Sequence, residues 1–368
     1  MKVLVTGSNG FIGRNLVAHL SLRDDVSVLP ISRDSSIAEL TRAVIAADFV
    51  FHLAGINRPV ELSEFQAGNV GFTETLCELL LKAGRKIPVA YASTIQADRD
   101  NAYGASKLAA EQVLRRYQQS SGAAAHIIRL PNVFGKWSRP NYNSVVATFC
   151  YNIGRGLPIR ISDPEAQMSL VYIDDVVETF ISSMDCARQI DEAYPVKPCY
   201  SATVGELASQ IQAFRNCRDT LVIERVGSGL ARALYATYVS YLPTSQFAYE
   251  IAKHEDSRGE FVEMLKTMDS GQFSYFTAHP GVTRGGHYHH TKTEKFLVIR
   301  GSALFKFKNL ITGEQFGLQT SGRKPEIVET VPGWAHDITN IGNDEMIVML
   351  WANENFDRTR PDTYAHKT

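Results

Sequence analysis

A glycine-rich turn lies between a short apolar segment and an amphipathic segment at the start of the chain. The apolar residues 2–6 predict a β-strand, residues 14–20 predict a helix, and Gly7, Gly10 and Gly13 lie between them. Glycines at this spacing allow a tight turn, a close approach of the backbone to a pyrophosphate and a close contact between helix and strand, while the helix N-terminus offers N–H donors. We therefore predict a dinucleotide site whose contacts are Gly7, Asn9, Gly10, Phe11, Ile12 and Gly13.

The order of predicted elements divides the 368 residues into two domains. Up to about residue 173, strand-like runs alternate with helical runs, which is typical of a parallel sheet wrapped by helices. Beyond about residue 247, short strands alternate with Gly and Pro turns. We predict an α/β fold, with a Rossmann-type parallel sheet in residues 1–245 and an all-β domain in residues 246–368. The expected strands are 2–6, 26–31, 49–53, 89–93 and 125–130 in the first, and 291–299, 303–307, 326–331 and 346–351 in the second.

The second predicted strand ends at Ser32 and Arg33, where an NAD-binding fold usually carries an acidic residue for the ribose hydroxyls. An arginine at this position can pair with a 2′-phosphate instead. NADPH is therefore the favoured cofactor, with Ser32 and Arg33 near its adenosine ribose. The alternative is an exposed loop arginine without a function.

A tyrosine and a lysine four residues apart open a helical pattern at residues 101–107. Tyr103 and Lys107 would then lie on one face of the helix, where an ammonium group could lower the pKa of the phenol and bind the nicotinamide ribose. The strand before them ends in Ser93 and Thr94, which would offer hydroxyls to the same cleft. The pair by itself is a weak signal, because this spacing is common on helices.

These motifs together resemble the extended short-chain dehydrogenase/reductase family. The resemblance covers about two thirds of the chain and includes Asn69 and the segments 6–13, 52–55, 93–94, 103–107, 131–135 and 171–176. It implies that Tyr103 is the acid/base, that Lys107 tunes it and that Thr94 polarises the carbonyl, with Ser93 as the alternative. It also implies cofactor contacts at Leu53, Ala54, Gly55, Tyr103 and Lys107, and substrate contacts at Asn132, Arg139 and Asn141, although Asn132 and Asp175 alternatively only cap turns. We interpret His52 as a core histidine.

Seven of the ten histidines follow Lys253, and three of them recur with a glutamate in a pattern that favours a metal. His287 and His289 alternate along a predicted strand and so share a face, onto which Glu294 and His336 can converge inside a small barrel. Three imidazoles and a carboxylate are suitable zinc ligands. The alternatives are a barrel with polar contacts and no ion, and a site in which His290 replaces a neighbour as ligand or acts as a base.

The spacing Gly-x5-His-x-His-x4-Glu-x6-Gly from Gly281 to Gly301 resembles the first cupin motif, and residues 332–340 resemble the second. The resemblance implies a cupin jelly roll. The segment 284–288 also resembles deoxysugar 3,5-epimerases, which use a histidine base. His287 is thus both a candidate ligand and a candidate base.

A reductase domain joined to a cupin resembles the bifunctional enzymes of capsular polysaccharide biosynthesis. That resemblance implies C3 epimerisation of a UDP-2-acetamido-2,6-dideoxy-4-hexulose by the cupin, followed by NADPH-dependent reduction of C4 to give UDP-N-acetyl-L-talosamine. It also implies a homodimer. Two alternatives are a 4-keto-sugar reductase whose cupin only supports structure or dimerisation, and a non-enzymatic sensor of NADPH and a sugar nucleotide. The presence of Thr94, Tyr103 and Lys107 argues against the sensor.

Charge and composition restrict the partners that the sequence predicts. A net charge of −1 argues against a nucleic-acid partner, and the sequence shows neither a signal peptide nor a membrane-spanning apolar stretch. The five cysteines are scattered and contain no Cys-x-x-Cys pair, which predicts buried, reduced thiols in a cytoplasmic protein.

Overall fold

The structure is a computed structural model that describes residues 1–185, 196–359 and 361–368. The chain forms two compact units, one of residues 1–211 and 232–242 and the other of residues 212–231 and 243–368. The proposed boundary at 245–246 lies close to residues 242–243, where the chain passes from the first unit to the second for the last time. The segment 212–231 groups with the second unit, although the sequence-based division assigns it to the first domain.

The first unit is an α/β fold around a parallel sheet, which is the predicted class. Its elements in chain order are β1 (Lys2–Thr6), α1 (Phe11–Leu20), β2 (Ser27–Ile31), α2 (Ile37–Ala46), β3 (Phe49–His52), α3 (Ser63–Phe65), the π-helical turn η1 (Gln66–Gly71), α4 (Phe72–Lys82), β4 (Val89–Thr94), α5 (Ala102–Ser121), β5 (Ala125–Leu130), β6 (Asn132–Phe134), α6 (Val145–Gly154), β7 (Gln167–Tyr172), α7 (Ile173–Asp185), β8 (Tyr200–Thr203), α8 (Val204–Thr220, whose last residues belong to the second unit) and α9 (Gly229–Ser240).

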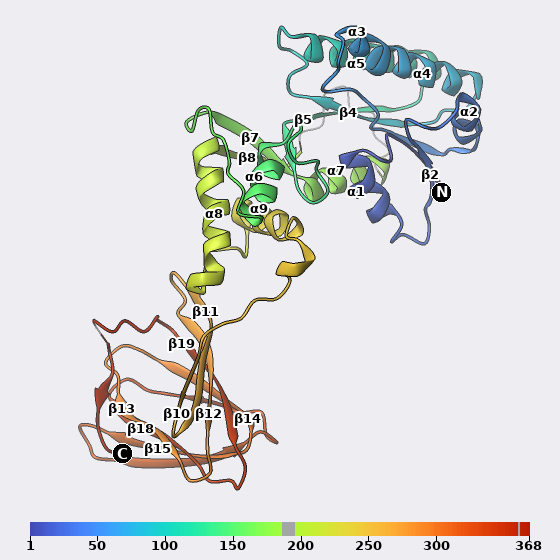
Figure 1. Ribbon diagram of the computed structural model, residues 1–368. Helices are drawn as coiled ribbons and strands as arrows, with labels where there is room; N and C mark the ends of the chain where they lie inside the picture. The colour runs from blue at the N-terminus through green and yellow to red at the C-terminus, as the bar shows by residue number, and fades with distance from the viewer. Residues whose placement is uncertain (186–195, 360) are drawn as a thin grey trace. The chain divides into compact units, whose positions relative to one another are not determined.

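The main sheet has the order β2-β1-β3-β4-β5, and every neighbouring pair is parallel. Helices α4 and α5 pack together over one face, and α1 and α7 pack together on the other (Figure 1). A smaller sheet, β6-β7-β8, follows it in the chain. Since the carboxyl ends of parallel strands share one edge, the turns after β1, β3 and β4 converge there and form the rim of a cleft.

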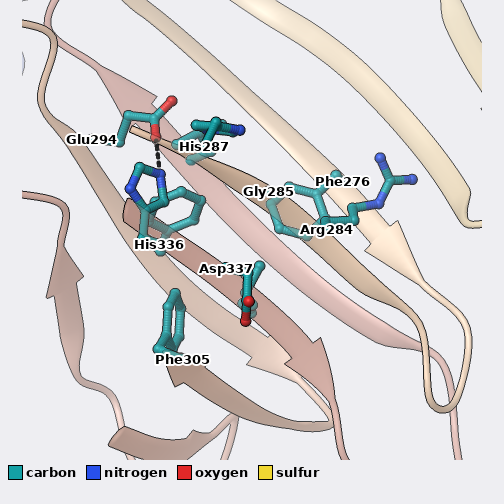
Figure 2. Close-up of a pocket in the computed structure, with 11 residues that line it drawn as sticks. Phe276, Arg284, Gly285, His287, Glu294, Phe305, His336 and Asp337 are labelled. Carbon is teal, nitrogen blue, oxygen red and sulfur yellow. Dashed lines mark ion pairs between the residues drawn. The ribbon is translucent and has the colours of Figure 1, made fainter. Parts of the chain in front are cut away.

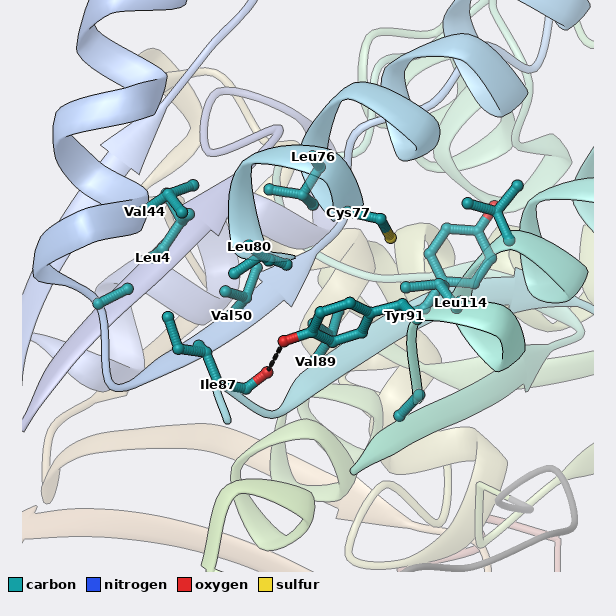
Figure 3. Packing of buried hydrophobic residues seen from close by; sticks show 14 of the residues in the cluster. Leu4, Val44, Val50, Leu76, Cys77, Leu80, Ile87, Val89, Tyr91 and Leu114 are labelled. Carbon is teal, nitrogen blue, oxygen red and sulfur yellow. Dashed lines mark hydrogen bonds between the residues drawn. The ribbon is translucent and has the colours of Figure 1, made fainter. Parts of the chain in front are cut away.

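Strands β3 and β4 are buried along their whole length, as expected for a parallel sheet covered on both faces. Their side chains pack with those of the helices in a core that includes Leu4, Leu76 and Leu114 (Figure 3). This packing fixes the ends of the strands that carry the polar residues of the cleft.

The glycine-rich turn has the close approaches that its sequence predicts. A Cβ atom on Gly13 would lie 2.1 Å from the carbonyl oxygen of Gly7, and one on Gly7 would lie 2.7 Å from the backbone nitrogen of Ala54. Gly7 also has a positive φ of 71°. Larger residues at these two positions would push the helix and the third strand away from the turn.

Apart from the ends of α8 and α9 within residues 212–231, the second unit is built of β-strands, in agreement with the predicted fold class. It contains β9 (Val222–Ile223), the 3-10 turn η2 (Thr244–Gln246), β10 (Lys253–Asp256), β11 (Gly259–Thr267), β12 (Gln272–Ala278), β13 (Thr283–Tyr288), β14 (Glu294–Arg300), β15 (Ser302–Asn309), β16 (Gln315–Ser321), β17 (Ile327–Glu329), β18 (Trp334–Asn340), β19 (Met346–Ala352) and β20 (Tyr364–Ala365).

Two sheets enclose the core of this second unit. One has the order β10-β11-β12-β19-β14-β17, with β9 beside β11, and the other has the order β16-β15-β18-β13-β20. Figure 1 shows these sheets facing one another as a small barrel. Aromatic and aliphatic side chains from both sheets, among them Phe276, Phe296, Phe305 and Val348, fill the space between them.

Two sequence-based expectations need correction. The strand expected over residues 291–299 begins at Glu294, because the amide groups of His290, Thr291 and Lys292 donate to the carboxylate of Asp362 and not to a neighbouring strand. Of the five cysteines expected to be buried, Cys77 and Cys150 are buried, Cys217 is partly buried and Cys199 is exposed, while Cys186 lies outside the described residues. Within the described ranges, no helix has the length and apolar character needed to cross a membrane.

Candidate functional sites

A cavity of about 680 Å³ in the first unit brings together most of the predicted reductase residues. Several predicted residues lie elsewhere. Ser32, Ala54 and Asn141 do not line the cavity, and the amide of Asn141 donates to the Thr148 hydroxyl. The predicted residues that do line it are Gly7, Asn9, Gly10, Phe11, Ile12, Gly13, Arg33, Leu53, Gly55, Thr94, Tyr103, Lys107, Asn132 and Arg139.

Tyr103 enters this cavity from the first turn of α5. The side chain of Asn101 caps the helix by accepting from the amide of Gly104 at 2.7 Å. A Cβ atom on Gly104 would lie 2.1 Å from the carbonyl oxygen of Gln96, so glycine allows the start of the helix to approach the loop that follows β4. This contact sets Tyr103 beside the carboxyl end of β4, where Thr94 lies.

Thr94 and Tyr103 line the same cavity, and the Thr94 hydroxyl accepts from the amide of Gln96 at 3.2 Å. Burial raises the pKa of Tyr103, and the influence of the neighbouring Thr94 hydroxyl only partly opposes this effect. The sequence suggested a lowered pKa, but burial is the larger influence on the phenol. A phenol with a raised pKa keeps its proton at neutral pH, which suits a group that donates a proton during reduction.

Lys107 lies one turn further along α5 and is buried. Burial lowers its pKa to about 7, and the nearby carboxylate of Glu111 opposes the shift. Its Nζ lies 4.2 Å from the centre of the Tyr91 ring, a cation–π distance. A buried ammonium group acts more strongly on its neighbours than one in water would.

Glu111 continues the same helix face, and its role is missed by the sequence reasoning. It is 1 % exposed and accepts hydrogen bonds from the Ser93 hydroxyl and from Arg129, at 2.9 Å to Nε and 2.7 Å to Nη2. The Ser93 hydroxyl is therefore bound to Glu111, which leaves Thr94 as the candidate hydroxyl beside Tyr103. The i, i+4 spacing from Lys107 to Glu111 was the available sequence signal.

His52, interpreted as a core residue, is 1 % exposed and is hydrogen-bonded to the hydroxyls of Thr6 and Thr73 at 2.8 and 2.9 Å. Burial lowers its pKa to about 3, so its imidazole is neutral. Asn132 lines the cavity and donates from Nδ2 to the carbonyl oxygen of Ser169 at 3.0 Å, which leaves its Oδ1 available to a ligand.

In the second unit, His287, His289, Glu294 and His336 form one cluster. One potential ligand atom from each lies within 4.8 Å of all the others. His287 on β13 is directly opposite His336 on β18, and Glu294 begins β14. His289 lies one residue beyond β13 and still reaches the cluster, with its ring centre 4.9 Å from that of His287.

The protonation states of this cluster fit a divalent cation. The Nδ1–H group of His289 donates to the carbonyl oxygen of Asp362, and in neutral His289 this leaves a lone pair on Nε2, 3.2 Å from Oε2 of Glu294. Two acceptors facing each other need a proton or a metal between them. Burial tends to raise the pKa of Glu294, but the histidines and Lys292 outweigh it and lower the pKa. Burial, together with the charge of His336, lowers the pKa of His287 to about 4.

A cavity of about 110 Å³ adjoins the cluster. Figure 2 shows His287, Glu294 and His336 gathered on one side, with Arg284 and Asp337 further along it. The register of β13 shifts between Gly285 and His287, so Arg284 and His287 line the same cavity although they are three residues apart. Because of this bulge, strict alternation along the strand does not predict that Arg284 lines the cavity with His287.

His290, the alternative base or ligand, is exposed and does not line this cavity. Its ring packs against Tyr288 and Tyr364, at 5.4 and 4.9 Å between ring centres. The structure therefore brings His287, but not His290, to the barrel cavity.

The fold and the first site define an extended short-chain dehydrogenase/reductase, a class of oxidoreductase that uses a nicotinamide cofactor. Residues 3–195 match the NAD dependent epimerase/dehydratase family, and residues 254–364 match the polysaccharide biosynthesis C-terminal domain. The chain is 60 % identical, over 99 % of its length and 98 % of the relative's, to the UDP-2-acetamido-2,6-beta-L-arabino-hexul-4-ose reductase of Pseudomonas aeruginosa. It belongs to the family of that reductase.

Solved structures give the same picture of the fold. The capsular polysaccharide assembling protein CapF from Staphylococcus aureus is 38 % identical and superposes with a TM-score of 0.94, with both chains covered in full. A UDP-glucuronic acid 4-epimerase from Bacillus cereus, solved with NAD, is 18 % identical with a TM-score of 0.55 over 66 % of this chain and 98 % of its own. At 18 % identity, the second likeness concerns the fold alone.

Proposed function

We propose that this protein acts on a UDP-2-acetamido-2,6-dideoxy-4-hexulose in two steps. The barrel inverts C3, and the first unit then reduces the C4 ketone with NADPH to give UDP-N-acetyl-L-talosamine. The observation that carries the proposal is the presence of two separate cavities, each with its own set of acid/base groups. The 60 % identity to a reductase of a UDP-linked hexul-4-ose supports the substrate class.

The glycine cradle fits a dinucleotide, because Gly7 and Gly13 leave no room for a Cβ atom and line the cavity that contains Tyr103. When bound, NADPH supplies a hydride to C4. We assign Tyr103 to donate its proton to the C4 oxygen, and Thr94 to orient the phenol and the carbonyl through its hydroxyl. Lys107 stabilises the phenolate left after the transfer, and Arg33 at the cavity edge meets the 2′-phosphate.

The sugar is proposed to lie between the cofactor and the smaller sheet, where Asn132 and Arg139 line the cavity. Two exposed arginines, Arg139 and Arg58, lie 5.1 and 5.7 Å from the centre of the Tyr142 ring. Their positive charge suits the diphosphate of a nucleotide sugar.

In the barrel, the facing lone pairs of His289 and Glu294 fit a divalent cation, most readily zinc, held by His287, His289, Glu294 and His336. The ion would supply Lewis acidity at the ketone, which acidifies the proton on C3. Among the candidate bases, His287 lines the cavity and has an imidazole that burial keeps neutral, and so able to accept a proton. The variant His287→Ala distinguishes the role of metal ligand from that of base.

The test is to incubate the full chain with the UDP-4-keto-sugar in D₂O, first without and then with NADPH, and to follow the sugar by NMR. We expect deuterium at C3 without NADPH, and one NADPH consumed per sugar reduced when it is added. Reduction without inversion at C3 would leave the barrel with a structural or dimerising role only.

A further inference from the structure

The last seven residues of the chain lie beside the loop that carries part of the barrel cluster. Strand β20 pairs antiparallel with β13, which sets Ala365 opposite His287 and Tyr364 opposite Tyr288. The rings of Tyr288 and Tyr364 stack at 5.3 Å, and the amide of His366 donates to the carbonyl oxygen of Gly286 at 2.9 Å. The C-terminal segment 362–368 therefore forms an edge of the barrel next to the cluster.

Asp362 is the centre of this contact. Its carboxylate accepts from the amides of His290, Thr291 and Lys292 at 2.9, 2.7 and 2.8 Å, and from the Thr291 hydroxyl at 3.0 Å. Three consecutive amides directed at one carboxylate fix the course of the loop that joins β13 to β14. His289 precedes this loop and Glu294 follows it, so the carboxylate constrains both ends of the cluster.

The main chain of Asp362 acts on His289 directly. Its carbonyl oxygen can only accept, so the hydrogen bond from His289 must come from an Nδ1–H group. This contact selects the tautomer in which Nε2 carries the lone pair, and it is Nε2 that faces Glu294. In metal sites, such an outer hydrogen bond fixes the orientation of the ring and strengthens the ligand.

From these contacts we propose that Asp362 is a positioning residue for the barrel metal site, acting through the tautomer of His289 and through the loop 290–292. The inference rests on the proposed metal function. It adds that the affinity for the ion depends on the C-terminal segment 362–368, which is distant from the cluster in the sequence. This segment contacts His289 but supplies no ligand.

The test uses the full-length protein and measures zinc affinity by equilibrium competition with a chromophoric chelator. Asp362→Ala is expected to weaken zinc binding roughly 10–100-fold, the usual range for the loss of an outer partner of a ligand. Asp362→Asn keeps one acceptor oxygen and is expected to fall between Asp362→Ala and the wild type. Hydrogen exchange of peptides spanning 289–293, measured without metal, should be faster in Asp362→Ala.

Two control variants separate positioning from general damage. Asp344→Asn changes an exposed carboxylate that bonds to no other side chain in the described part of the chain, and it should leave affinity unchanged. Asn340→Ala removes a fully buried amide that bonds to the carbonyl oxygens of Ala278 and Asp344, so it should lower the melting temperature yet leave zinc affinity in the folded protein near that of wild type. Should Asp362→Ala fail to fold, Asp362→Asn carries the comparison.

The outcomes are distinct. Equal zinc affinity in the wild type and in the folded Asp362 variants would overturn this inference and leave the metal function standing. A wild-type protein that binds no zinc would overturn both. A loss of affinity in the Asp362 variants that Asn340→Ala does not share would support the proposal.

Discussion

The two cavities assemble their reactive groups over very different distances along the chain. Tyr103, Lys107 and Glu111 lie on consecutive turns of α5, and one capped helix sets their spacing. The barrel cluster draws His287, Glu294 and His336 from three different strands, with His289 between two of them. The first site therefore depends on one helix meeting one strand end, whereas the second depends on the register of a whole barrel.

Each of the two sites has a buried carboxylate near its basic groups, and the partners of the two carboxylates differ. Arg129 forms ion pairs with Glu111 and with the exposed Asp98. Glu111 does not line the cavity, and its charge favours the protonated form of Lys107. Glu294 faces His289 and His336 directly and takes Lys292 as a further partner at 3.4 Å. The first carboxylate is thus a structural counter-charge, and the second is a candidate ligand.

If the two sites act independently, removal of the phenol should abolish one reaction and spare the other. Tyr103→Phe is expected to lower the rate of ketone reduction by about a hundredfold or more, the effect of a missing general acid. Deuterium exchange at C3 should be unchanged, and NADPH should still bind. Tyr151→Phe, which alters a tyrosine that does not line the cavity, is the control. Reduction by Tyr103→Phe at nearly the wild-type rate would show that another group delivers the proton.

The converse experiment changes the barrel. His289→Ala should reduce bound zinc from about one ion per chain to nearly none and should abolish exchange at C3, while NADPH binding stays at the wild-type level. His287→Ala separates two roles. Loss of exchange with zinc retained would identify a base, and loss of both would identify a ligand. A barrel that exchanges the C3 proton at full rate without metal would contradict the proposed Lewis acid.

The contrast between the sites explains what could be predicted from the sequence. Helical spacing placed Tyr103 and Lys107 on one face, and the strand before them placed Thr94 near by. The cupin-like spacing named the four side chains that the structure brings together in the barrel, although β13 ends before His289. Strands buried on both faces, such as β4, were recognisable as apolar runs.

The residues that position these groups could not be predicted from the sequence, because their contacts form only in the folded barrel. Asp362 contacts His290, Thr291 and Lys292 only because the barrel closes, and no local pattern encodes that contact. Arg284 joins His287 through a bulge that breaks the alternation of the strand. Local spacing thus predicted the groups proposed to react, but the groups that hold them required the tertiary structure.

A third variant tests whether the counter-charge in the first site matters to its chemistry. Glu111→Gln keeps the shape of the side chain and removes the charge that opposes the loss of the proton from buried Lys107. We expect reduction to slow by about tenfold, which corresponds to about 1.4 kcal/mol, with C3 exchange unaffected. Asp98→Asn alters the exposed end of the same network and should have little effect, because solvent screens it. Equal losses in both variants would point to general destabilisation of the network.

The smallest expected effect concerns the choice of cofactor, since Arg33 is an exposed side chain at the edge of the first cavity. A partly solvated pair between a guanidinium and a phosphate is worth about 1 kcal/mol, which corresponds to roughly fivefold in affinity. Arg33→Ala should therefore raise the KM for NADPH by about that factor and leave the KM for NADH unchanged, because NADH has no 2′-phosphate. Arg42→Ala, an exposed arginine on α2 that does not line the cavity, should change neither value. Equal increases in the KM for both cofactors would mean that Arg33 stabilises the turn after β2 and does not bind the 2′-phosphate. A preference for NADPH that survived in Arg33→Ala would assign the discrimination to other residues of the cavity.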